Sequence, residues 1–385
     1  MESIVIRNFG PIESVEIREV KKITVFIGES GSGKSTIMKV LALFRWLYKM
    51  MNIRSFLKYS QIPKSPFRFQ FISLLRSSGL IEYLRDDSVL EYGNGSLHLR
   101  WDSTVGKLTG TTSYIPKEEL SLEKISFISD KRNLIPDMLD GSIALKRETY
   151  YVNETYSDFE MAVAAVHEMP ISNLGVKFVT RKTGYGMKYL IVPEDGSNSF
   201  SVGLRASSSG TQNIVPLNVI VEYYARHYDL VSSINKAVLS YVSKSDSLSD
   251  FTAVKNIGDF TNRNVHLFIE EPELSLFPSS QSDLMDFLTE SIYDERERGY
   301  GISLMMATHS PYIVNYLNVL LRRAYRADLQ NGSFVRPEDL AVYRVYDGRI
   351  QNLVGTGDEA RVLVDTHDLS DEMEVIYREY TELVR

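Results

Sequence analysis

Short apolar runs alternate with segments of helical spacing along most of the chain. Runs rich in Val, Ile, Leu, Met or Phe predict buried strands, and apolar residues that recur every three or four positions predict helices. The predicted buried strands are Lys22–Ile27, Lys124–Ser129, Val265–Ile269 and Ile302–Ala307. Helices are predicted at Thr36–Leu43 and Val215–Tyr224, and two short strands, Ile4–Phe9 and Val15–Ile17, come first in the chain. Strands that alternate with helices indicate an α/β protein.

The first glycine-rich turn has the pattern of a phosphate-binding P-loop. It reads Gly28-Glu29-Ser30-Gly31-Ser32-Gly33-Lys34-Ser35-Thr36 and lies between a predicted strand and a predicted helix. Glycines let the backbone amides turn toward phosphates at the positive end of the helix. In such a loop Lys34 reaches the β- and γ-phosphates and Ser35 ligates Mg²⁺, while the phosphate cradle is formed by Gly28, Ser30, Gly31, Gly33 and Thr36. Nucleoside triphosphate binding is therefore the leading interpretation, and a structural glycine turn is the alternative.

The bulk composition adds limits to this picture. The 385 residues are 43% hydrophobic and 24% charged, which is ordinary for a soluble globular protein. The absence of cysteine excludes disulfides and thiolate metal sites. No secretory signal and no apolar stretch of membrane-spanning length is recognised, so we expect a cytoplasmic protein without membrane contact. The net charge of −7 argues against a generally basic nucleic-acid surface.

One stretch departs from this acidic balance. Residues 37–81 contain eight Lys and Arg residues but no Asp or Glu, and aromatic residues are interleaved among them. This pattern suits phosphate contact and base stacking, but it also fits a helical hairpin with buried aromatics and solvated cations. We expect its outer part to bind an anionic partner, either nucleic acid or an acidic protein. The residues of that outer part are Arg54, Lys58, Lys64 and Arg68.

The second half of the chain supplies carboxylates and a histidine after predicted strands. Val265–Ile269 runs into Glu270 and Glu271, the pattern of a Walker B segment, and Ile302–Ala307 runs into Thr308 and His309. In a Walker B segment Glu270 would hold Mg²⁺ through water, and Glu271 would polarise the attacking water. The alternatives are a buried strand that runs into a charged turn and a structural histidine.

The order of these motifs resembles the ABC-type ATPase head of SMC proteins, recombination-repair ATPases and the OLD-like ATPases of bacterial defence systems. The resemblance implies an α/β P-loop NTPase with a mixed central sheet, an N-terminal antiparallel β subdomain and a helical lobe. Within it, Ser208–Gln212 is similar to the signature motif, so Ser208 and Gly210 would cap the γ-phosphate bound to another subunit. Glu273–Pro278 would be the D-loop and His309 the switch histidine. Lys34, Glu271 and His309 are the implied catalytic residues, ATP and Mg²⁺ the cofactors, and a dimer the smallest active assembly.

The resemblance also narrows the expected role. No long heptad segment for a coiled-coil arm is present, and the residues after Pro311 lack the acidic motifs of a Toprim nuclease. The chain therefore resembles the stand-alone OLD-like ATPases of PARIS, Septu or retron-associated type. Such an ATPase would switch a separately encoded effector, a nuclease or toxin, in anti-phage defence. A nucleotide-gated scaffold and a DNA-repair ATPase that acts on DNA are the alternatives.

The expected division of the chain follows the motifs. Residues 1–148 would form a P-loop lobe with a helical insertion at about 44–84, residues 149–262 a helical signature lobe, and residues 263–385 the C-terminal core. Three positions depart from the family pattern. Glu270 stands where many relatives have Asp, and Ser207 stands where the signature has Leu. The Q-loop glutamine has no secure match: Gln61 and Gln70 lie in the insertion, and Asp130 and Arg132 follow a strand at the right place without being glutamine.

Overall fold

The structure is a computed structural model of the chain. It describes residues 1–60, 69–139, 150–171, 174–184, 186–196, 200–242, 260, 262–294, 298–326, 333–355, 362–367 and 378–383. None of the helices within these ranges combines the length and apolar character needed to cross a membrane.

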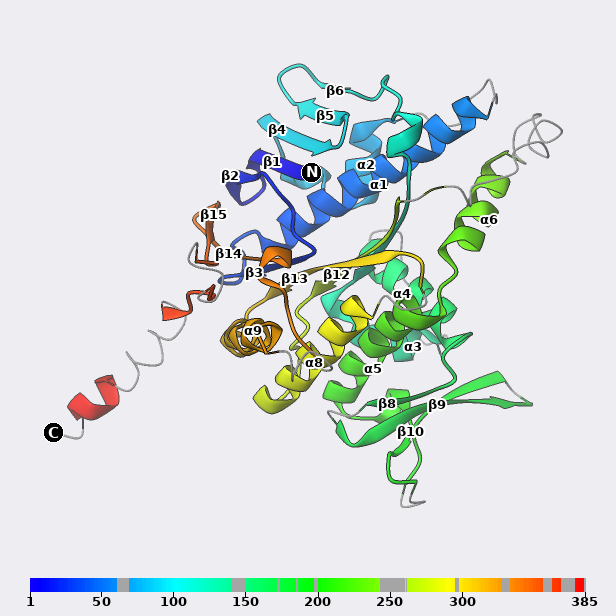
Figure 1. The fold of residues 1–385 in the computed structure, drawn as a ribbon. Helices are drawn as coiled ribbons and strands as arrows, with labels where there is room; N and C mark the ends of the chain where they lie inside the picture. The colour runs from blue at the N-terminus through cyan, green and yellow to red at the C-terminus, as the bar shows by residue number, and fades with distance from the viewer. Residues whose placement is uncertain are drawn as a thin grey trace.

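A six-stranded central sheet forms the body of the molecule (Figure 1). Its order is β15-β14-β3-β13-β12-β7, and all neighbours pair in parallel except β14 with β15. The strands are β3 (Ile23–Ile27), β7 (Ser121–Ile128), β12 (Asn262–Glu270), β13 (Gly301–Thr308), β14 (Leu340–Tyr346) and β15 (Arg349–Asn352). All five residues of β3 are buried, because helices cover both faces of a parallel sheet.

Two antiparallel sheets flank this body. The first has the order β2-β1-β4-β5-β6, and the second has the order β11-β10-β9-β8. Their strands are β1 (Glu2–Phe9), β2 (Ile12–Ile17), β4 (Leu84–Asn94), β5 (Leu97–Asp102), β6 (Lys107–Thr109), β8 (Glu168–Ile171), β9 (Val176–Thr183), β10 (Gly186–Pro193) and β11 (Val202–Gly203). In Figure 1 the two lie at opposite ends of the molecule.

The helices fill the layers between and around the sheets. α1 lies between the first antiparallel sheet (β2-β1-β4-β5-β6) and the central sheet. α8 and α9 lie on the opposite face of the central sheet (Figure 1). The helices are α1 (Lys34–Tyr59), α2 (Phe71–Ser77), α3 (Ile135–Leu139), α4 (Tyr150–Val163), α5 (Ser209–Glu222), α6 (Leu230–Val242), α8 (Pro278–Tyr293) and α9 (Pro311–Ala324). A single π-helical turn, Tyr223–His227, continues α5.

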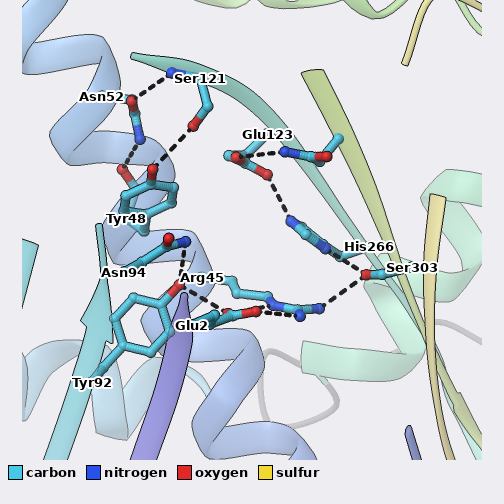
Figure 2. Close-up of polar contacts among 11 residues, drawn as sticks. Glu2, Arg45, Tyr48, Asn52, Tyr92, Asn94, Ser121, Glu123, His266 and Ser303 are labelled. Atoms are coloured by element: carbon cyan, nitrogen blue, oxygen red, sulfur yellow. Dashed lines mark hydrogen bonds and ion pairs between the residues drawn. The ribbon is translucent and has the colours of Figure 1, made fainter. Parts of the chain in front are cut away.

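A buried polar network joins α1 to the sheets on either side of it (Figure 2). Arg45 of α1 is 3% exposed and donates to both carboxylate oxygens of Glu2 in β1, at 2.8 and 2.7 Å. It also donates to the hydroxyl of Ser303 in β13, at 3.3 Å. That hydroxyl lies 2.7 Å from Nδ1 of His266, whose Nε2 lies 2.6 Å from the carboxylate of Glu123. The network therefore connects the first antiparallel sheet, through β1, to β7, β12 and β13 of the central sheet.

The predicted fold class is confirmed: the chain forms an α/β fold with a mixed central sheet, an antiparallel N-terminal sheet and a helical region. The predicted strands and the helix after the P-loop are present. Within the helical insertion expected at about 44–84, the described residues include the second part of α1 and the short α2. The predicted domain boundaries stay predictions.

Candidate nucleotide-binding site

The predicted motifs meet at one edge of the central sheet. The P-loop follows β3, Glu270 ends β12, and His309 follows β13. These strands are parallel neighbours, with Thr308 opposite Ile27 and Glu270 opposite Ala307. Because parallel strands end at the same edge, segments far apart in sequence form one site there.

The P-loop requires glycine where it passes its neighbours. Gly28 and Gly33 have φ values of 156° and 108°, which L side chains rarely adopt. A Cβ at Gly28 would lie 2.3 Å from the carbonyl oxygen of Val345, and a Cβ at Gly33 would lie 2.4 Å from Cδ1 of Ile12. The loop is therefore held between the β1–β2 turn and the end of β14.

Lys34, the first residue of α1, points back over this loop. It is 5% exposed, and its Nζ donates to the carbonyl oxygens of Gly28 and Glu29, at 2.7 and 2.8 Å. Burial lowers the pKa of Lys34, and the charges of Glu271 and Glu273 oppose that shift. The Oγ of Ser32 in the same loop is buried and has no hydrogen-bond partner among the described residues. Both side chains are donors that phosphate oxygens can satisfy.

Glu270 is a buried carboxylate that is paired with a lysine. It is 3% exposed, and its Oε1 lies 3.0 Å from Nζ of Lys39 on α1. The two residues are 231 positions apart, so the pattern of the basic stretch around Lys39 gives no local signal of this pair. The pair links the helix that begins at the P-loop to the end of β12.

Glu271 adopts an unusual backbone conformation. Its φ is 44°, in the left-handed region that costs a residue other than glycine about 1–3 kcal/mol. Its N–H donates to the carbonyl oxygen of Ala307, at 2.8 Å, and its Oε1 lies 3.5 Å from Nε2 of His309. Burial raises the pKa of Glu271, and the nearby His309 opposes that shift.

Glu273 holds the backbone beside the histidine. Its Oε1 accepts a hydrogen bond from the N–H of His309, at 2.6 Å. Its Oε2 is buried and has no hydrogen-bond partner in the described part of the chain. Together Glu271, Glu273 and His309 form a polar cluster opposite the P-loop lysine.

Arg132, which with Asp130 follows the strand where the sequence suggests a Q-loop, is bound to the predicted Walker B segment. It is fully buried and donates to the carbonyl oxygens of Glu270 and Glu271, at 2.8 and 2.7 Å. Burial lowers its pKa to about 10, and the charge of Glu273 opposes the shift. The alternative Gln70 lies outside the cavity described below, just before α2, and Gln61 lies outside the described residues.

The signature segment lies at the start of α5. Ser208 is the N-cap, and its Oγ accepts from the N–H of Thr211. A Cβ at Gly210 would lie 2.9 Å from the carbonyl oxygen of Ser275, so α5 packs closely against the predicted D-loop. Ser208 is exposed.

A cavity of about 730 Å³ lies over the P-loop. It is lined by residues 27–32, Pro11, His309, Pro311 and residues 344–348, which comprise the end of β14 and the β14–β15 turn. Of the predicted site residues, Gly28, Ser30, Gly31 and His309 belong to this lining, whereas residues 33–36, Glu270, Glu271, Ser208 and Gly210 do not. The contribution of the β14–β15 turn could not be predicted from the sequence, since nothing local marks its approach to a loop more than 300 residues earlier.

The basic stretch is less exposed than its composition suggests. Arg45 and Lys39 have buried carboxylate partners. Arg54 donates to the carbonyl oxygen of Ser113, at 2.7 Å, and stacks on the ring of Tyr114. Lys58 lies over the same ring, with its Nζ 3.6 Å from the centroid. Lys64 and Arg68 lie outside the described residues.

The donor set fits Mg²⁺ only together with phosphate oxygens. Across the described ranges no cluster of three or more His, Asp or Glu side chains could hold a metal by itself. The Ser35 hydroxyl and the Glu270 carboxylate are hard oxygen donors near the P-loop, and Mg²⁺ is commonly bound by one or two such ligands plus substrate phosphates. The residues present therefore fit a nucleotide-bound Mg²⁺.

Comparison with protein families identifies the class of the chain. The model of the AAA ATPase domain family matches residues 1–66 and 100–314. The chain belongs to the AAA ATPase domain family. Membership of this family supports ATP binding and ATPase activity at the level of the family. The β14–β15 turn lies outside the matched residues of this AAA ATPase domain. A comparison with curated proteins found no match.

Several solved structures are similar to this AAA ATPase over most of its length. The SMC head domain from Thermotoga maritima shares 12% identity, covers 92% of this chain and 98% of its own, and has a TM-score of 0.36. A dimeric ATP-binding cassette bound to ADP and Pi shares 11% identity, covers 92% and 100%, and has a TM-score of 0.32. The recombination mediator RecF shares 10% identity, covers 91% and 97%, and has a TM-score of 0.31.

Proposed function

We propose that the chain binds ATP with Mg²⁺ over the P-loop and hydrolyses it with Glu271 as the general base. The observation that carries this proposal is the meeting of Lys34, Glu271 and His309 at one edge of the sheet, with Glu271 3.5 Å from His309. Phosphoryl transfer depends mainly on positioning and on stabilisation of charge. Within this proposal Gly28, Ser30, Gly31, Gly33 and Thr36 cradle the phosphates, and Lys34 contacts the β- and γ-phosphates.

The remaining side chains take roles that follow from their positions. Glu271 accepts a proton from the attacking water, and His309 orients Glu271 and contacts the γ-phosphate. Ser35 and Glu270 are the residues that would hold Mg²⁺, which supplies positive charge to the phosphates when it is bound. The ammonium group of Lys39 pairs with the buried Glu270 carboxylate, at 3.0 Å.

We further propose that the active assembly is at least a dimer. Ser208 and Gly210 belong to the predicted signature at the start of α5, where Ser208 is the exposed N-cap. The exposed N-terminus of α5 offers backbone N–H groups and a partial positive charge, which suit the γ-phosphate of a nucleotide on a second subunit. Two copies would thus complete each other's sites.

A mixing experiment tests this assembly. Ser208→Asp keeps a side chain that caps α5, and it places a negative charge against the γ-phosphate. Neither Lys34→Ala nor Ser208→Asp protein is expected to hydrolyse ATP alone. An equimolar mixture should regain up to about a quarter of wild-type activity, because half of the dimers then contain one intact composite site when association is random. Activity is measured as phosphate release per subunit.

The mixture also has an outcome that excludes the composite site. If both variants fold and associate, yet no mixing ratio restores hydrolysis, the signature of one chain does not serve the P-loop of another. Size-exclusion chromatography of a tagged variant with an untagged one establishes association independently of activity.

Control of a separately encoded effector is proposed from the OLD-like resemblance. In this proposal the ATP-bound assembly holds or releases a nuclease or toxin in anti-phage defence. Purification of the chain together with the products of neighbouring genes tests the idea. A scaffold that uses ATP only as glue between subunits is the second candidate, and it differs because Glu271 would be dispensable.

Contact between the basic stretch and nucleic acid or an acidic effector stays a prediction. Because Arg54 contacts Ser113 and Tyr114 and Lys58 lies over the Tyr114 ring, the sharper test reverses Lys64 and Arg68 and leaves Arg54 and Lys58 unchanged. We expect weaker binding of a labelled DNA duplex or the copurified effector, with a steep dependence on salt, and ATPase activity near wild type. Unchanged binding at low and high salt would show that the stretch is a solvated face.

A further inference from the structure

Arg132 is a buried cation, and among the described residues its hydrogen-bond partners are all backbone carbonyl oxygens. Its Nη1 donates to Glu270 and Ser129, at 2.8 and 3.2 Å, its Nη2 donates to Glu271, at 2.7 Å, and its Nε donates to Asn213, at 3.0 Å. The side chain is fully buried. The planar guanidinium thus holds three segments of the chain together: the turn after β7, the end of β12, and the first turns of α5.

The hydrogen bond from Arg132 to the carbonyl oxygen of Glu271 is one of two bonds that hold the strained backbone of this residue. The left-handed backbone of Glu271, with a φ of 44°, persists only where its surroundings hold it. On one side its N–H donates to Ala307, and on the other its carbonyl accepts from Arg132. Since the two peptide groups set the direction of the Cα–Cβ bond, these bonds together fix the direction in which the Glu271 side chain leaves the backbone.

The bond to Asn213 anchors Arg132 to the signature helix. Asn213 is in the first turns of α5, and its Nδ2 donates to the carbonyl oxygen of Ser209, at 2.9 Å. Gly210 lies against the carbonyl oxygen of Ser275, four residues after Glu271. The start of α5 and the Walker B turn therefore contact each other directly and through the guanidinium.

We propose that Arg132 is a positioning residue that sets the direction of the Glu271 carboxylate, with the signature helix as its anchor. This inference rests on the proposed ATPase function. Arg132 lies behind the site and donates to the backbone, so it contacts neither the nucleotide nor the attacking water. Loss of an arginine with a purely structural role would impair folding, but it would not lower the rate of hydrolysis selectively.

Arg132→Lys separates these roles. Lysine keeps the charge but loses the planar fork, so it cannot satisfy Glu270, Glu271 and Asn213 together. We expect kcat to fall about 10–100-fold, as for loss of a group that orients a catalytic side chain. The KM and Kd for ATP should stay within about threefold of wild type, because the P-loop is untouched. The neighbouring exposed Lys131→Gln is the matched control and should behave as wild type.

The same measurements can overturn the inference. An unchanged kcat would show that the bond to Glu271 has no role in hydrolysis. A parallel loss of kcat, ATP affinity and thermal stability would show a structural role only. If Arg132→Lys does not fold, Arg132→Gln removes the buried charge and is measured in the same way. Absence of hydrolysis by wild-type protein would instead refute the proposed function itself.

Mixed dimers give a directional test. In the Lys34→Ala and Ser208→Asp mixture, the Ser208→Asp chain supplies the working P-loop and Glu271, and the other chain supplies only its signature. Adding Arg132→Lys to the Ser208→Asp chain should abolish most of the restored activity, whereas adding it to the Lys34→Ala chain should leave that activity largely unchanged. Equal losses in both arms would mean that Arg132 serves folding or assembly, and would overturn the inference.

Discussion

Glu271→Gln is expected to stop ATP hydrolysis while ATP stays bound. Glutamine has nearly the same shape but cannot accept the proton of the attacking water, so the rate should fall about 10²–10⁴-fold. Binding should persist because the phosphate cradle and Lys34 lie on the other side of the site. Lys34→Ala should instead abolish ATP binding, because its ammonium is the cation of the cradle. Phosphate release and binding of a fluorescent ATP analogue distinguish the two effects.

Matched variants define what this result means. Glu16→Gln changes an exposed carboxylate on β2 and should leave both measurements unchanged. If Glu271→Gln hydrolyses ATP at the wild-type rate, Glu271 is not the base. If Glu270→Gln stops turnover while the affinity for Mg²⁺ is unchanged, Glu270 rather than Glu271 is the general base, and the Walker B assignment shifts by one residue. The pairing of Glu270 with Lys39, rather than with His309, favours the frame adopted here.

Among substitutions of the cations in the basic stretch, Arg45→Met is expected to lower the free energy of unfolding most. It removes the partner of the Glu2 carboxylate and leaves that charge buried, which costs about 3–5 kcal/mol. Urea unfolding followed by circular dichroism measures the loss. The double variant Glu2→Gln with Arg45→Met removes both charges and should recover part of it.

The ion pair between Arg45 and Glu2 is expected to make the stability of the fold depend on pH. Burial alone raises the pKa of Glu2, but the charge and hydrogen bonds of Arg45 outweigh it and hold the pKa below 4.5. The stabilisation is therefore present above pH 4.5 and is lost as the pH falls through the lowered folded value. The stability gap between wild type and Arg45→Met should narrow on acidification. A gap below about 1 kcal/mol at neutral pH would show that the pair contributes no more than a surface ion pair.

The nucleotide site could be predicted from sequence where its chemistry is local. The P-loop, the Glu270-Glu271 pair and His309 each follow a buried strand, and parallel pairing brings strand ends together. The tertiary partners could not be predicted in this way. Arg132 reaches Asn213 and Glu271, and Arg45 reaches Glu2 and Ser303, through contacts that leave no periodic signal. The same holds for the β14–β15 turn that lines the cavity.

Composition misled most clearly in the acid-free stretch. Its cations have no carboxylate within 37–81, yet Lys39 and Arg45 are paired with Glu270 and Glu2, which lie outside that range. Aromatic rings hold Arg54 and Lys58. A local excess of Lys and Arg in the sequence therefore does not establish a basic surface, because the balancing carboxylates come from distant elements.

The specific ATPase activity of the wild-type protein, measured as a function of protein concentration, tests the composite site most directly. A site shared between two copies gives an activity per subunit that rises with concentration and then reaches a plateau as dimers form. Addition of excess Glu271→Gln protein at low concentration should raise the activity of each wild-type subunit, since the variant still supplies a signature. An activity per subunit that is constant from monomeric to dimeric concentrations, or no hydrolysis at any concentration, would contradict the account.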